Sequence, residues 1–326
     1  MSIAREKLDY NGCFARVKHN FGFRPGDASC IIFSLVYRES DLKFTVEEFR
    51  AWETKRVTLV GMSGVGKSFL SAKLRGSNWF HYSGDYRIGT RYLNEHIIDM
   101  IKTQAIRIPF LKELLRNDWI YIKNNIRIND LGPVLSFVGK LGDPERGGVE
   151  IGEFIERQAI YRQAEVDAMY DIPHFIDKAR NIYGYQHFVN DVGGSLCELD
   201  EPGVMDILVD NTLILYIQVT NQEQEQMLIE RAVSDPKPLY YRPEFLQEHL
   251  RMYFAETGLE YAAQIDPDDF ARWVFPRLFH SRLPRYAKIA RLGYTVTSGE
   301  VEGVHNDKDF MQLLETAIAR QPGDEG

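Results

Sequence analysis

The sequence is poor in cysteine and contains no long apolar run. Its three cysteines, Cys13, Cys30 and Cys197, are widely spaced and form no CxxC pair, so they support neither a disulfide framework nor a zinc site. No run of about 18 apolar residues is present, and the amino terminus lacks the continuous apolar stretch of a signal peptide. These absences predict a cytoplasmic protein with buried free thiols and without a membrane partner.

Basic residues are fewer than acidic residues. The chain carries 39 Lys and Arg against 47 Asp and Glu, a net charge of −8. Because broad phosphate-backbone binding needs clustered positive charge, this balance argues against nucleic acid as a partner. The 326 residues are 44% hydrophobic and include only 25 Gly and 13 Pro. That composition is typical of a globular chain and excludes collagen-like, low-complexity and wholly disordered proteins.

One motif in the chain carries a specific chemistry. Gly61-Met-Ser-Gly-Val-Gly-Lys-Ser68 fits GxxxxGK[ST] in full, after a buried-type strand at 56–60 and before a helix at 68–75. Such a loop points backbone N–H groups at a phosphate, Lys67 reaches the β/γ oxygens, and the Ser68 hydroxyl coordinates Mg²⁺. The motif therefore predicts a bound nucleotide with Mg²⁺. The predicted nucleotide-binding residues are Gly61, Ser63, Gly64, Val65, Gly66, Lys67, Ser68 and Phe69.

The rest of the chain predicts an α/β fold, a parallel-sheet P-loop NTPase core with helices on both faces. Further strands are expected at 78–82, 186–190, 212–219 and 293–297, and helices within 91–127, at 151–170 and at 308–320. Residues 1–52 are predicted to form a β-rich appendage, with a strand at 29–37 and a capping box at 45–48. Residues 53–326 would form the main domain, with helical insertions at about 90–150 and 242–278.

A P-loop alone leaves ATPase, GTPase, kinase and nucleotide-binding regulator open. Asp85 follows the second predicted strand, at the sheet edge where ligands of open α/β sheets lie, so it is a candidate to orient an acceptor hydroxyl. The alternative is an aspartate that caps a helix.

The order of motifs resembles shikimate kinase, within the nucleoside-monophosphate-kinase-like group of P-loop kinases. Asp85-Tyr-Arg-Ile88 matches the second half of that family's DxDxxI, and Tyr161-Arg162-Gln-Ala-Glu165 looks like FRxxE. Gly193-Gly194-Ser195 is similar to its glycine turn, Lys237-Pro-Leu-Tyr240 to RPLL, and Arg282-Leu-Pro-Arg-Tyr286 to R-x-P-x-Y. The resemblance covers roughly half of the chain, and only the P-loop is diagnostic by itself.

The resemblance implies an ATP-dependent kinase that phosphorylates a hydroxyl of a small, anionic acceptor. In that scheme Asp85 orients or deprotonates the hydroxyl, Lys237 offsets charge on the transferring group, and Arg231 lies near the adenine. Arg162 and Arg282 would clamp the acceptor's negative group beside Gly193 and Gly194. Taken singly, these motifs also fit a surface ion pair, a tight turn and solvated charges.

The departures from the family leave a second function open. Ser83 replaces the first carboxylate of DxDxxI, so Asp191 is predicted to support the metal together with Ser68. Ser195 replaces the third glycine, and Lys237 keeps the charge of the lid arginine without its bidentate fork. The insertions favour an alternative, a nucleotide-dependent switch or assembly ATPase whose insertions bind a protein partner. A kinase of a nucleic acid or protein target is a third alternative, which the net charge of −8 disfavours.

Overall fold

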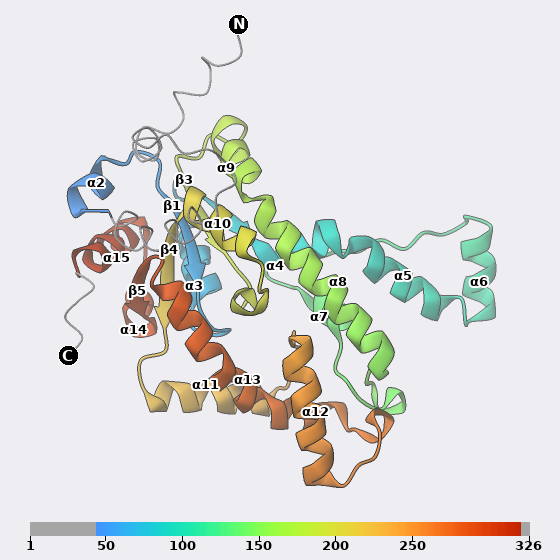
Figure 1. The fold of residues 1–326 in the computed structure, drawn as a ribbon. Coiled ribbons are helices and arrows are strands. Elements are labelled where there is room, and N and C mark those ends of the chain that lie inside the picture. The colour runs from blue at the N-terminus through green and yellow to red at the C-terminus, as the bar shows by residue number, and fades with distance from the viewer. Residues whose placement is uncertain (1–43, 321–326) are drawn as a thin grey trace, which may run out of the picture.

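The computed structural model describes residues 44–320 (Figure 1). The β-type segments expected before residue 44, including that at 29–37, lie outside the described residues, as do Cys13 and Cys30. The predicted capping box is confirmed at helix α2 (Val46–Ala51). There the Glu48 carboxylate accepts from the Thr45 N–H at 2.9 Å, and the Thr45 hydroxyl accepts from the Glu48 N–H at 3.2 Å.

A five-stranded parallel sheet forms the centre of the molecule, in the order β2-β3-β1-β4-β5. The strands are β1 (Arg56–Val60), β2 (Trp79–Ser83), β3 (His187–Asp191), β4 (Leu213–Gln218) and β5 (Tyr294–Thr297). Leu59 of β1 is in register with Asp191 of β3 and with Leu215 of β4. Because helices cover a parallel sheet, its central strands β1 and β4 are largely apolar in sequence. The predicted α/β P-loop architecture is confirmed.

Helices surround the sheet (Figure 1). The helix predicted at 151–170 is α8 (Ile151–Tyr170), and the terminal helix is α15 (Asp307–Ala319). The stretch 91–127 holds the two helices α5 (Asn94–Ala105) and α6 (Pro109–Arg116), but the chain becomes irregular at Asp118, whose φ of 54° is incompatible with a helix. The remaining helical elements are α3 (Lys67–Lys73), α4 (Gly84–Arg87), η1 (Ile88–Tyr92), α7 (Gly132–Val138), η2 (Pro144–Arg146), α9 (Ile172–Asn181), η3 (Leu196–Glu198), α10 (Pro202–Asn211), α11 (Gln222–Ser234), α12 (Pro243–Thr257), η4 (Ala262–Gln264), α13 (Pro267–Ala290) and α14 (Ser298–Glu302).

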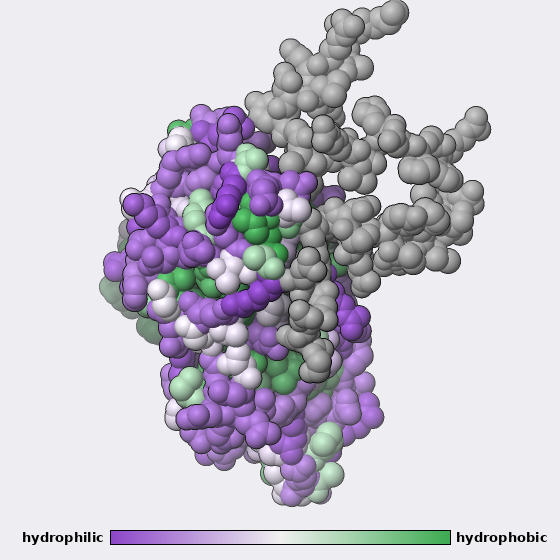
Figure 2. Space-filling model, turned by 90° about the vertical axis from the view of Figure 1, so that its left-hand side faces the viewer, coloured by the Kyte–Doolittle hydropathy of each residue, from purple (hydrophilic) through white to green (hydrophobic). Residues whose placement is uncertain are grey.

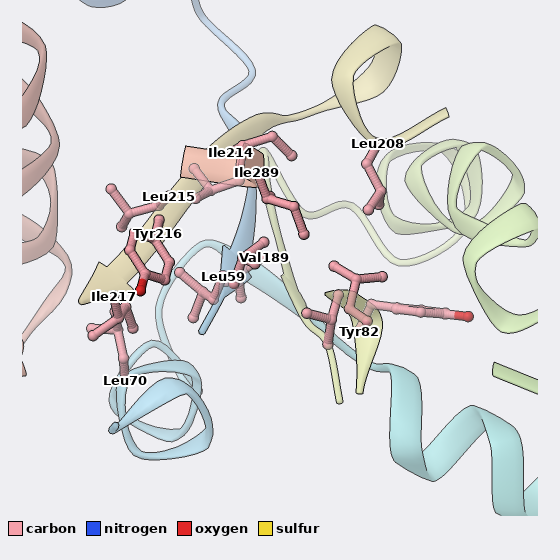
Figure 3. Close-up of a cluster of buried hydrophobic side chains, with 14 of the residues drawn as sticks. Leu59, Leu70, Tyr82, Val189, Leu208, Ile214, Leu215, Tyr216, Ile217 and Ile289 are labelled. Atoms are coloured by element: carbon pink, nitrogen blue, oxygen red, sulfur yellow. The ribbon is translucent and has the colours of Figure 1, made fainter. Parts of the chain in front are cut away.

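Two hydrophobic clusters stabilise the described part of the chain. The larger lies on the sheet and includes Leu59, Val189 and Leu215 (Figure 3). The smaller lies between the first turns of α8, helix α12 and the first half of α13, and includes Phe154 and Phe270. Helices α8 and α13 contribute side chains to both clusters, so they join the two parts of the molecule.

The surface beside α2 and α15 is mainly hydrophilic, with small scattered apolar areas (Figure 2). Within residues 44–320, no helix is long and apolar enough to cross a membrane. Cys197, the one cysteine in this range, is a buried free thiol, as predicted, and burial raises its pKa to about 12.

Candidate active site

The loop between β1 and α3 has the backbone geometry of a phosphate cradle. Gly61, Gly64 and Gly66 have φ angles of 151°, 91° and 104°, which side chains with a Cβ atom rarely adopt. A Cβ atom on Gly61 would also lie 2.7 Å from the Ile217 carbonyl oxygen. Only glycine at these positions lets the loop curl around a small anion, so the residues present fit a nucleotide phosphate.

The Lys67 side chain folds back onto the backbone of the loop. Its ammonium group donates to the carbonyl oxygens of Gly61 at 2.7 Å and Met62 at 2.9 Å, and the side chain is buried. Burial lowers its pKa, while the nearby Asp191 and Asp85 raise it. Ser68 is exposed in the first turn of α3, where its hydroxyl is available to a metal-bound nucleotide.

The other predicted nucleotide-binding residues line the same loop. Ser63 is exposed, Val65 is buried, and the half-exposed Phe69 ring lies 4.9 Å from the Lys73 ammonium. Helix α11 brings Arg231 against the tip of the loop, because a Cβ atom on Gly64 would lie 3.8 Å from an Arg231 terminal nitrogen.

Asp85 lies in the first turn of α4, two residues after the end of β2. It does not cap this helix, because the Ser83 hydroxyl accepts from the Tyr86 N–H at 3.3 Å instead. Ser83, the residue that departs from the family pattern, therefore has a structural role. Burial raises the pKa of Asp85 to about 6, the negative charge of Asp191 adds to the shift, and Lys67 opposes it.

A second buried carboxyl group, that of Glu165 on α8, lies with Asp85 at the turn after β3. A Cβ atom on Gly193 would lie 2.9 Å from Glu165 Oε1 and 3.0 Å from Asp85 Oδ1, so both carboxyl groups face this residue. The Ser195 hydroxyl donates to Glu165 Oε2 at 2.6 Å, whereas Glu165 Oε1 is buried without a hydrogen-bond partner. The same turn touches the P-loop, because a Cβ atom on Gly194 would lie 2.2 Å from Ser63 Oγ.

Asp191, the predicted metal-supporting residue, is buried at the end of β3 in register with Ser83. Its carboxylate lies 3.8 Å from His81 Nε2. Among residues 44–320, no group of three His, Cys, Asp or Glu side chains is placed to hold a metal by itself. A Mg²⁺ ion at this place would take most of its ligands from a nucleotide, with the exposed Ser68 hydroxyl and the buried Asp191 carboxylate as the oxygen groups that the chain offers.

Three predicted site residues have partners outside this cluster. Arg282 is buried, donates to Glu198 Oε2 at 2.8 Å and to the Tyr240 carbonyl at 3.0 Å, and is not free to bind an acceptor. Arg162 donates to the Leu199 carbonyl at 2.9 Å. Lys237 is exposed, and its ammonium group lies 3.6 Å from the Asp235 carboxylate.

Sequence reasoning missed two of the buried carboxyl groups. Glu165 is part of the FRxxE-like motif, but no function was predicted for it, and its spacing from Arg162 was the only sequence signal. Glu198 carried no signal at all, because nothing local distinguishes it from the acidic residues that follow it.

The fold and the loop define an α/β P-loop protein. No protein-family model matches the sequence, and no curated protein matches it. Among solved structures it is similar to a shikimate kinase from Bacteroides thetaiotaomicron, with 16% sequence identity and a TM-score of 0.36. That match covers 82% of this chain and 95% of the other.

Proposed function

We propose that this chain is an ATP-dependent phosphotransferase that phosphorylates a hydroxyl group of a small acceptor. The observation that carries the proposal is that one turn borders both the P-loop and the buried carboxyl groups. Gly193 contacts Asp85 and Glu165, and the adjacent Gly194 packs on Ser63 of the P-loop. A carboxyl group suited to hold a hydroxyl thus lies beside a cradle suited to hold phosphate.

Each residue of the cluster would have a distinct task. The P-loop with Lys67 would hold ATP, Ser68 and Asp191 would keep Mg²⁺ in place, and Arg231 would lie along the nucleotide. ATP with Mg²⁺ supplies the phosphoryl group and neutralises its charge. Asp85, with a pKa of about 6, is ionised at neutral pH and would accept the hydroxyl proton of the acceptor. Lys237, whose ammonium group is exposed, would offset charge on the transferring group.

The contacts of the two arginines bear on the proposed acceptor. Glu198 already neutralises Arg282, and Leu199 engages Arg162, so a negatively charged acceptor is no longer required. A small hydroxylated acceptor remains in the proposal. The proposal also includes a cytoplasmic location. It divides the chain into residues 1–52 and 53–326, with insertions at about 90–150 and 242–278.

The test is ADP release measured with and without a panel of small hydroxylated compounds. We expect acceptor-dependent turnover that Lys67→Ala abolishes, whereas the matched control Lys73→Ala, on the same helix, retains it. Asp85→Asn should lower kcat about 100-fold or more with ATP affinity unchanged, because it acts on the acceptor hydroxyl.

A switch or assembly ATPase is the second candidate function, and the engaged Arg282 favours it. It predicts ATP turnover that no hydroxylated compound increases and that Asp85→Asn leaves unchanged. That outcome would overturn the kinase proposal.

A further inference from the structure

Residues 94–131 form an arm that extends away from the sheet (Figure 1). It comprises α5, α6 and the irregular segment that leads to α7. No residue from 101 to 125 is buried. Large apolar side chains are nevertheless concentrated there: Phe110 is 68% exposed, Trp119 67% and Tyr121 85%. Such a concentration at the end of a projection marks an interaction site.

Helix α6 separates apolar from charged residues. Phe110, Leu111, Leu114 and Leu115 follow helical spacing and share one side, while Lys112 and Arg116 lie on the other. No residue of this helix is buried. Leu111, Leu114 and Leu115 are half-buried and Phe110 is exposed, so the described part of the chain covers the apolar side only in part. Ile108, 52% exposed, precedes the helix and extends the apolar surface.

The arm is basic in an acidic protein. Residues 101–127 contain six Lys and Arg and two acidic residues, a net charge of +4, although the whole chain carries −8. Along residues 44–320, Lys102 is the one basic residue of this segment found in an ion pair, with Asp99 at 3.2 Å. No ion pair within residues 44–320 involves the other basic residues of the segment, which are Arg107, Lys112, Arg116, Lys123 and Arg127.

A second copy of this chain fits the arm poorly. Two arms face to face would bring like charges together. Elsewhere in residues 44–320 the exposed apolar side chains Phe69, Ile155 and Met252 lie on three separate helices, and Ile182 and Tyr183 form one adjacent pair after α9. A lipid bilayer with anionic headgroups offers both an apolar interior and negative charge.

We propose that the tip of the arm, residues 106–123, binds peripherally to anionic membranes, with Phe110 and Trp119 inserted among the lipids and the basic residues at the headgroups. Trp and Tyr prefer this interfacial depth. The prediction of no membrane partner was based on the lack of a long apolar run, which a surface anchor of this kind does not need. The proposal is independent of the kinase chemistry.

Tryptophan fluorescence of the full chain with lipid vesicles tests the proposal. Of the four tryptophans, Trp52 and Trp79 are buried, and Trp273 is covered by the Arg277 guanidinium at 3.7 Å. A blue shift on adding vesicles therefore reports on Trp119. We expect the shift with phosphatidylcholine vesicles that contain about a third phosphatidylglycerol, its loss in high salt, and little shift with phosphatidylcholine alone.

Matched variants separate the arm from the rest of the surface. Arg116→Gln combined with Lys123→Gln should weaken vesicle binding about tenfold or more, and Phe110→Ser should do the same. The controls Lys288→Gln with Arg291→Gln, and Ile182→Ser at 67% exposure, should bind like the native chain. Trp119→Phe should remove the blue shift while sedimentation with vesicles persists.

Two outcomes overturn the proposal. The first is a chain that neither shifts nor sediments with anionic vesicles, which would leave a protein partner for the arm. The second is a concentration-dependent blue shift without lipid that Phe110→Ser abolishes, which would assign the arm to a second copy.

Discussion

Glu165 shows how a single buried carboxyl group links the site to the pH dependence of stability. Burial raises its pKa to about 8, the hydrogen bond from Ser195 opposes the shift, and Asp85 adds to it. The buried Oε1, without a partner, is consistent with a carboxyl group that keeps its proton in the folded protein. In the unfolded chain the same group releases its proton near its ordinary value of 4.5.

The free energy of unfolding should therefore fall as the pH rises from about 4.5 to about 8. Over this interval the unfolded state binds fewer protons than the folded state, so raising the pH favours unfolding. In the Glu165→Gln variant this fall in the free energy of unfolding, on the order of a few kcal/mol, should be absent, because the glutamine amide does not titrate. Urea unfolding at a series of pH values measures this.

Glu302→Gln, at an exposed position of α14, is the control and should keep the native pH profile. A Glu165→Gln profile parallel to that of the native chain would show that Glu165 does not hold its proton when folded.

At the scale of elements, the strands and the P-loop were predictable because each depends on local residues. Arg56–Val60 is an apolar run followed by a complete glycine motif, and both strand and loop were confirmed. The ion pair of Arg282 was not predictable. It joins residues 84 positions apart, and no local pattern encodes a partner at that separation. The sequence correctly placed Asp85 near the carboxyl end of β2, but its closeness to Glu165 depends on the packing of α4 against α8, which are far apart in sequence.

The turn after β3 couples this strand to the P-loop, and Gly194 is the contact. A methyl group there would lie 2.2 Å from Ser63 Oγ and 3.1 Å from the Ser63 backbone nitrogen. Gly194→Ala should therefore displace the P-loop and weaken binding of an ATP analogue about tenfold, a cost in the range of about 1–3 kcal/mol for an overpacked contact. Isothermal titration calorimetry measures this affinity.

Gly299→Ala is the matched control, because its nearest contact would be Thr297 Oγ1 at an ordinary 4.0 Å. Equal affinities of the two variants would show that the turn does not set the shape of the cradle.

At the scale of the whole molecule, a buried charge pair lies where the two hydrophobic clusters meet. Arg282 is on α13 between Leu278, in the smaller cluster, and Tyr286, in the larger. Its partner Glu198 is fully buried, in the short helix η3 that follows the β3 turn. The pair also binds the Tyr240 carbonyl, so it fixes the segment before α12 against the core. Breaking this network should affect the stability of the whole chain.

We expect Glu198→Ala to lower the free energy of unfolding by about 3–5 kcal/mol, because it leaves a buried guanidinium without its counter-charge. The double variant Glu198→Leu with Arg282→Met should recover most of this loss, since an apolar pair needs no charge partner. Glu201→Ala removes the partly exposed pair with Arg162, at 3.7 Å, and should change stability by less than about 1 kcal/mol. If denaturant unfolding gives Glu198→Ala the same stability as Glu201→Ala, then water reaches Arg282 in solution. The guanidinium would then be available to an anionic acceptor after all.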